Sequence, residues 1–103
     1  MAALEAMSQG LPCLLSSACN LPEAFAAGAA VPAEPESSSL IDSLRLFFSM
    51  ADQARQLMGR NGRCLTETRF HWNQIAHMTH EVYGWILNGG PVPACVQLSG
   101  INC

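Results

Sequence analysis

The sequence contains no lysine, and its five basic residues are arginines scattered along the chain without forming a run. Proteins that bind nucleic acid or adhere to membranes through basic segments concentrate their positive charge. Scattered arginines and a formal net charge of −3 therefore speak against both classes. No apolar run approaches the roughly 20 residues of a membrane-spanning helix. We expect neither a nucleic-acid partner nor a transmembrane segment.

The sequence also lacks closely spaced cysteine pairs. Five cysteines are present, an odd number, at positions Cys13, Cys19, Cys64, Cys95 and Cys103. Zinc sites usually show paired ligands at short spacing, and disulfide scaffolds usually have an even count. We therefore expect reduced cysteines. The amino terminus lacks the basic region of a secretory signal, and Glu5 stands where that charge belongs. These features predict a cytoplasmic protein without a cofactor or a metal.

What the chain does have is apolar residues in a helix-and-strand pattern. Half of its 103 residues are hydrophobic, which is high for one small domain and predicts apolar surface that faces a partner. Gly10 and Pro12 separate the first expected helix from a strand, and Gly28 follows the second expected helix. The expected helices and strands are helix Ala2–Gln9, strand Cys13–Ser17, helix Leu21–Ala27 and strand Ala29–Ala33.

Three longer helices are expected after a loop whose serines, Ser37 to Ser39, suit a helix cap. The first runs from about Ser38 to Met50, with Leu40, Ile41, Leu44, Phe47 and Phe48 at helical spacing. The second begins near Asp52 and directs Leu57, Met58 and Leu65 inward, although Gly59 and Gly62 weaken its middle. The third ends at Asn88-Gly89-Gly90 and carries on one face Trp72, Ile75, Ala76, Thr79, Tyr83 and Ile86.

The order of these segments predicts an α/β fold, because strands that alternate with helices pair in parallel. We expect two short parallel strands with flanking helices, mostly helical. The domain is expected to span residues 1–90, and residues 91–103 to form a tail. Two strands do not make a stable open sheet in water, so further sequence or a second copy is expected to complete it.

The segment Leu4-Glu5-Ala6-Met7-Ser8-Gln9-Gly10-Leu11-Pro12-Cys13 resembles the C-terminal nucleotide-binding domain of retaining glycosyltransferases with two Rossmann domains (group 1, GT-B type). The similarity spans roughly Ala2 to Pro93, and it implies the partial, C-terminal half of a Rossmann-like domain. It continues through Asn20-Leu21-Pro22-Glu23, Gly28, Met58-Gly59, Gly62-Arg63, Phe70-His71-Trp72 and Tyr83-Gly84-Trp85. In that family His71 stands where Ser or Asp usually caps a helix, which predicts a weaker helix start.

The resemblance assigns donor-nucleotide binding to Glu5 and, at the start of its helix, to Met1 and Ala2. The family's donor motif has two glutamates separated by seven residues, and Glu5 matches the second, which binds the ribose hydroxyls. The first glutamate, most of the glycine-rich turn and the acceptor domain would precede Met1. A helix N-terminus suits a diphosphate, and a carboxylate can accept two ribose hydrogen bonds. No catalytic residue can be named.

Simpler interpretations stand beside these assignments. Glu5 and Glu23 both suit the positive end of a helix dipole, and for Glu23 we prefer that interpretation. His77, His80 and Glu81 are spaced for a metal on one helix face, but no third or fourth ligand partner is evident. A solvated polar face is therefore preferred. The aromatic residues Trp72, Tyr83 and Trp85 could stack on a sugar, but such spacing more often reflects core or interdomain packing.

The sequence thus predicts part of a glycosyltransferase that uses a nucleotide-diphosphate sugar, inactive as an isolated chain. Its partners would be the nucleotide-sugar donor of the whole enzyme and the missing N-terminal domain, or another copy of itself. A non-catalytic, self-associating α/β module and a small metal-binding helical protein remain the alternatives.

Overall fold

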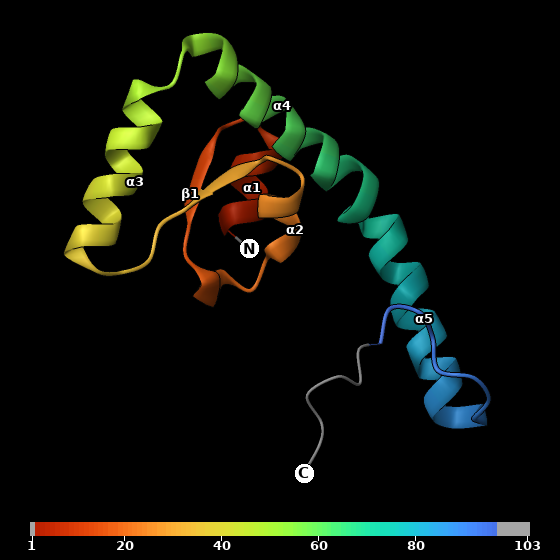
Figure 1. Ribbon diagram of the computed structural model, residues 1–103. Helices are drawn as coiled ribbons and strands as arrows, with labels where there is room; N and C mark the ends of the chain where they lie inside the picture. The colour runs from red at the N-terminus through yellow and green to blue at the C-terminus, as the bar shows by residue number, and fades with distance from the viewer. Residues whose placement is uncertain (1, 97–103) are drawn as a thin grey trace. The chain divides into compact units, whose positions relative to one another are not determined.

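The computed structural model describes residues 2–96, and their contacts divide into two units at Phe70. The first unit begins with helix α1 (Ala2–Ser8), strand β1 (Cys13–Leu15), the 3-10 helix η1 (Ser17–Cys19) and helix α2 (Pro22–Ala26). Strand β2 (Ala30–Pro32) and helices α3 (Ser37–Ser49) and α4 (Asp52–Arg69) complete it. The expected order of helices and strands is confirmed (Figure 1), and the fold is mostly helical.

The sheet has two strands, β1 and β2, which pair in parallel with Leu14 opposite Val31. Cys13, Leu15 and Ala30 join Met7 in the hydrophobic core, and Met7 is fully buried. Ala24 of α2, Leu65 of α4 and Ala29, just before β2, complete this core (Figure 1). The α/β class is therefore observed, with the core on one face of a very small sheet.

Helix α3 contacts β2 rather than joining that core. Its buried residue is Ser43, whose hydroxyl donates a hydrogen bond to the Pro32 carbonyl oxygen at 2.7 Å. The apolar residues Leu40, Ile41, Leu44 and Phe48 are instead exposed. A carbonyl that is partly removed from water needs a hydrogen-bond donor, which a serine supplies and a leucine does not, so a serine faces the strand.

Helix α4 buries a face made by Met58, Gly59, Gly62, Leu65 and Thr66. Leu57 is 52% exposed, so the expectation that it points inward is wrong, whereas Met58 and Leu65 are buried as predicted. Position 57 lies about 100° around the helix from position 58, off this face. The two glycines do not interrupt the helix, because both lie where α4 closely approaches the chain of α1 and its following turn.

The second unit contains helix α5 (Trp72–Asn88) and the chain that follows it. His71 caps α5 by accepting a hydrogen bond at Nδ1 from the Asn73 N–H at 3.3 Å, so the expected weak start is offset by the imidazole itself. No residue of α5 is buried, and Trp72 and Tyr83 are 73% and 63% exposed. After α5 the Val96 N–H donates to the Pro93 carbonyl. Residues 97–103 of the expected tail lie outside the described residues.

No helix within residues 2–96 combines the length and the apolar character needed to cross a membrane.

Candidate functional site

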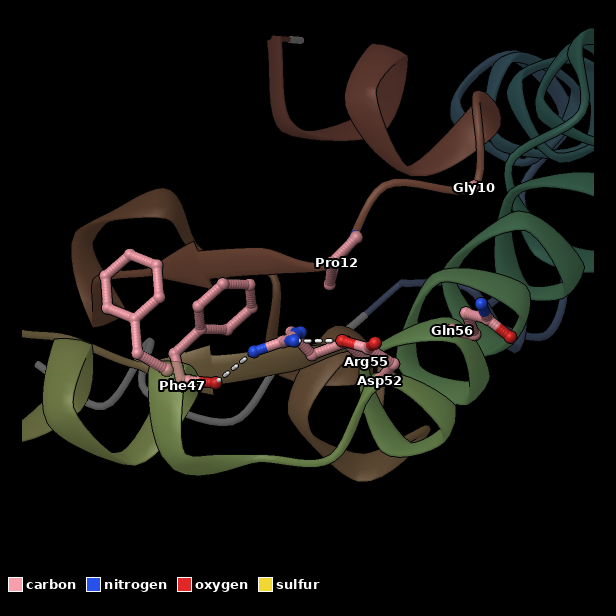
Figure 2. A pocket seen from close by; sticks show the side chains of 7 residues that line it. Gly10, Pro12, Phe47, Asp52, Arg55 and Gln56 are labelled. Atoms are coloured by element: carbon pink, nitrogen blue, oxygen red, sulfur yellow. Dashed lines mark hydrogen bonds and ion pairs between the residues drawn. The ribbon is translucent and has the colours of Figure 1, made fainter.

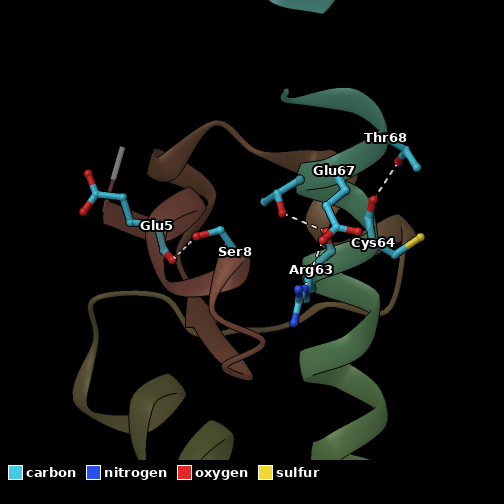
Figure 3. A network of polar contacts seen from close by, with 7 residues as sticks. Glu5, Ser8, Arg63, Cys64, Glu67 and Thr68 are labelled. Carbon is cyan, nitrogen blue, oxygen red and sulfur yellow. Dashed lines mark hydrogen bonds and ion pairs between the residues drawn. The ribbon is translucent and has the colours of Figure 1, made fainter. Parts of the chain in front are cut away.

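Glu5, the residue that sequence reasoning assigns to the donor ribose, lies in the first turn of α1 with its side chain exposed to solvent. Its carboxylate points away from the polar contacts on α4 (Figure 3). Only its main chain is engaged, because the Ser8 hydroxyl donates to the Glu5 carbonyl oxygen at 2.6 Å. No hydrogen bond or ion pair to the Glu5 carboxylate is present within residues 2–96. The carboxylate is therefore available to a ligand.

The position of Glu5 follows from the direction of its helix. Helix α1 and strand β1 run in opposite directions, so the start of α1 lies at the end where β1 finishes (Figure 1). Ala2, the other described candidate, is the exposed first residue of α1. Met1 lies outside the described residues. Ligands of open α/β sheets bind beyond the carboxyl ends of the strands, and Glu5 stands at that edge.

The same edge carries a pair of residues that sequence reasoning did not single out. Glu34, just after β2, accepts hydrogen bonds from both the backbone N–H and the hydroxyl of Ser17, just after β1, at 3.1 Å and 3.2 Å. The Glu34 N–H donates in turn to the Ser39 hydroxyl at 3.1 Å. This Ser17–Glu34 clasp fixes the two loops that follow the strands. Polar residues directly after both strands were the only signal in the sequence.

The expected serine cap of α3 takes another form. The N-cap residue is Glu36, which makes no side-chain capping bond, and the helix already includes Ser37. Ser39 serves the Glu34 backbone instead of a helix N–H. The expectation of a cap from Ser37 to Ser39 is therefore wrong, because the Ser39 hydroxyl accepts from the Glu34 N–H and the N-cap position is held by Glu36.

Glu23 occupies the first turn of α2, as expected for a residue that compensates the helix dipole. It also lines an open hollow of about 490 Å³ together with Arg69 and the apolar residues Pro22, Ala26 and Leu65. Neither Glu23 nor Arg69 has an ion-pair partner within residues 2–96. Glu5 does not line this hollow.

A second open hollow of about 470 Å³ lies at the amino end of β1 (Figure 2). Pro12 and Gly10 form one wall, and the other is formed by Phe47 and Phe48 of α3 and by Asp52, Arg55 and Gln56 of α4. The Arg55 guanidinium donates to the Phe47 carbonyl oxygen at 3.3 Å, pairs with Asp52 and lies 5.8 Å from the Phe47 ring centroid. The positive charge of Arg55 is therefore engaged in contacts where α3 meets α4. This hollow consequently has little free positive charge with which to bind an anionic nucleotide.

Arg63, one of the four arginines on α4, is also engaged. Arg63 Nε lies 3.0 Å from Glu67 Oε1, one helical turn further along α4 (Figure 3). This pair is exposed and so contributes little stability. Arg60 and Arg69, the other arginines of α4 besides Arg55, form no ion pair within residues 2–96.

His77 and His80, expected on one face of α5, do not form part of a metal-binding cluster within residues 2–96. His77 Nε2 lies 3.1 Å from Glu81 Oε1, an exposed pair one turn apart. Within the part of the chain that the structure describes, no three His, Cys, Asp or Glu side chains converge for a metal ion. Among the thiols, burial raises the pKa of Cys13, which keeps that side chain protonated and unreactive near neutral pH.

Comparison with protein-family models, with curated proteins and with solved structures found no match to this chain.

Proposed function

We propose that the chain is part of the nucleotide-binding domain of a retaining glycosyltransferase with two Rossmann-like domains. In this proposal Glu5 binds the ribose of a nucleotide-diphosphate sugar, and Ala2 and Met1 lie near the nucleotide. The observation that carries the proposal is the exposed Glu5 carboxylate at the edge where both parallel strands end, which has no hydrogen-bond or ion-pair partner within residues 2–96. A carboxylate without a protein partner can accept hydrogen bonds from two neighbouring hydroxyls.

The close contacts between α1 and α4 support the same proposal. A Cβ at Gly59 would stand 2.0 Å from the Gly10 carbonyl oxygen, and a Cβ at Gly62 would stand 3.3 Å from Met7. The residues that carry the family resemblance, Leu4 to Cys13 and Met58 to Arg63, therefore meet in space. Two segments that carry the resemblance but lie far apart in the sequence therefore contact each other. This contact holds α1, and with it the Glu5 carboxylate, in place.

The chain supplies only a part of what such a transfer needs. Sugar transfer requires a donor, an acceptor and groups that stabilise the developing charge, held together in one geometry. Glu5 is the one candidate ligand with a charged side chain, and α1 contains no arginine. We therefore propose that residues 1–103 alone do not transfer sugar, and that the glutamate nearer the sugar comes from preceding sequence.

We further propose a cytoplasmic location, with no metal or other cofactor. The four described cysteines are all free, and three of them are exposed, as expected in a reducing compartment.

The first test is the reading frame upstream of the Met1 codon. The proposal expects an in-frame continuation that encodes a glycine-rich turn and a glutamate eight residues before Glu5. A continuation without that glutamate and turn would contradict it.

The second test measures nucleoside diphosphate binding by the protein with its upstream sequence. Hydrogen bonds to a charged group contribute about 1.5–3 kcal/mol, so Glu5→Gln should weaken binding roughly 10- to 100-fold. It should also remove the preference for the ribonucleotide over its 2′,3′-dideoxy analogue. Glu23→Gln is the matched control, because Glu23 also lies in the first turn of a helix. Equal losses in the two variants would contradict a ribose role for Glu5.

A further inference from the structure

The Ser17–Glu34 clasp continues the pairing of β1 with β2 by one further step. Residues paired across the sheet lie 17 positions apart in the sequence, and the clasp keeps this offset. At the carboxyl ends of the strands the Ala33 N–H donates to the Leu15 carbonyl oxygen at 2.9 Å. In a regular parallel pair the next bond would join the Ser17 N–H to the Ala33 carbonyl oxygen. The Ser17 N–H instead donates to Glu34 Oε1, so a side-chain carboxylate takes the place of the next main-chain acceptor.

This replacement lets the two main chains separate directly after the strands. Strand β1 ends at Leu15 and β2 at Pro32, after which one chain turns into η1 and the other leads towards α3. A glutamate side chain reaches further than a main-chain carbonyl, so the Ser17 N–H stays paired although the regular strand pairing has ended. Ligands of open α/β sheets bind in a crevice outside the carboxyl ends of the strands, which is where the clasp lies.

Two glutamates therefore lie at this edge of the sheet, and their carboxylates differ in what they contact. Both carboxylate oxygens of Glu34 accept hydrogen bonds from Ser17, and the Glu34 N–H donates to the Ser39 hydroxyl at 3.1 Å. Glu34 is thus held by its main chain and by its side chain. The Glu5 carboxylate has no hydrogen-bond or ion-pair partner within residues 2–96. Glu34 is therefore placed to hold a loop, and Glu5 to contact a ligand.

We propose that Glu34 is a positioning residue of the nucleotide site, which fixes the loop of residues 16–20 beside the ribose bound at Glu5. This inference rests on the function proposed above. Glu34 touches no ligand and acts through Ser17. The start of α1 lies at the end of the sheet where β1 finishes (Figure 1), so the Glu5 site and this loop share one edge. Because the clasp fixes the loop in advance, the nucleotide does not have to order it on binding.

Calorimetric titration of the protein and its upstream sequence with UDP, GDP and ADP tests the proposal. Glu34→Ala frees the loop, which lowers the fraction of molecules in the binding conformation. Loss of ordinary hydrogen bonds should weaken binding of the ribonucleotide that binds best by roughly 2- to 10-fold. Affinity for its 2′,3′-dideoxy analogue should change by less than about twofold, because the ribose is the part that the loop holds against Glu5. A merely structural role of Glu34 would weaken both nucleotides equally.

Glu36→Ala is the matched control and should leave both affinities unchanged, because Glu36 lies two residues further on and makes no side-chain capping bond. Glu34→Gln keeps an acceptor for the Ser17 N–H and should show the same selective loss in weaker form. Circular dichroism checks that each variant is folded, and Glu34→Gln decides the matter if Glu34→Ala does not fold.

The outcomes separate this inference from the function on which it rests. Equal losses for the two nucleotides, or an unchanged affinity for the ribonucleotide, would overturn the positioning role of Glu34. If Glu5→Gln still weakens ribonucleotide binding in that case, the proposed function stands. No effect of Glu5→Gln, or no binding of the three nucleotides by the unaltered protein, would overturn the proposed function and this inference with it.

Discussion

Gly59 of α4 lies so close to Gly10 that a Cβ at position 59 would stand 2.0 Å from the Gly10 carbonyl oxygen. Gly10 itself has a φ of +74°, a conformation that glycine adopts without steric cost. The turn between α1 and β1 can therefore lie directly on the backbone of α4. This contact sets the position of α1, and with it the position of Glu5.

Substituting Gly59 should consequently destabilise the first unit. Gly59→Ala forces backbone against backbone, and overpacking of this kind costs about 1–3 kcal/mol or more. Gly84→Ala is the matched control, because Gly84 also lies inside a helix but has nothing within 4 Å of its added Cβ. The control should stabilise its helix by about 0.5–1 kcal/mol. Chemical denaturation followed by circular dichroism measures both, and equal effects of the two substitutions would show that the close contact is absent.

The clasp between Ser17 and Glu34 should contribute measurably to stability. Glu34→Gln replaces a carboxylate that accepts two hydrogen bonds, and we expect a loss of about 0.5–1.5 kcal/mol in the free energy of unfolding. Glu36→Gln is the control, since Glu36 makes no side-chain capping bond two residues away. A double-mutant cycle with Ser17→Ala should show non-additive losses. Additive losses would mean that the two side chains do not interact.

Because the Cys13 thiol is buried, the free energy of unfolding should decrease as the pH becomes alkaline. Burial raises the pKa of Cys13 in the folded chain above its ordinary value of 9.0. The unfolded chain therefore releases this proton first, and stability is full below about pH 9 and falls as pH rises towards the folded pKa. Cys13→Val should flatten this alkaline decline, whereas the exposed Cys64→Ala should keep it. Denaturation curves at several pH values measure the difference, and a decline unaffected by Cys13→Val would contradict it.

The order of helices and strands could be predicted because local signals specify it. Gly10, Pro12 and Gly28 mark the ends of the first segments, and the apolar spacing of later segments matches helices. The side of each helix that is buried was harder to predict. For α3 the apolar period suggests a buried face, yet the partner is a strand that presents the Pro32 carbonyl, so Ser43 is buried instead.

Prediction of the candidate site was limited in the same way. The location of Glu5 on the first helix followed from the short segment around it. The Ser17–Glu34 clasp joins residues 17 positions apart, and no local pattern links a serine after one strand to a glutamate after the next. The close contact of Gly59 with Gly10 also spans distant sequence. From sequence alone the glycines of α4 could only be read as weakening the helix.

Sugar transfer from a panel of nucleotide-diphosphate sugars tests the central claim most directly, when residues 1–103 are compared with the same chain preceded by its upstream sequence. Residues 1–103 should show no turnover, because the proposed donor site, Glu5 with Ala2 and Met1, lacks the second glutamate of the motif and the acceptor domain. The longer protein should transfer sugar and lose donor affinity when Glu5 is replaced by Gln. Turnover by residues 1–103 alone at ordinary enzyme rates, about 1–1,000 per second, would contradict the account.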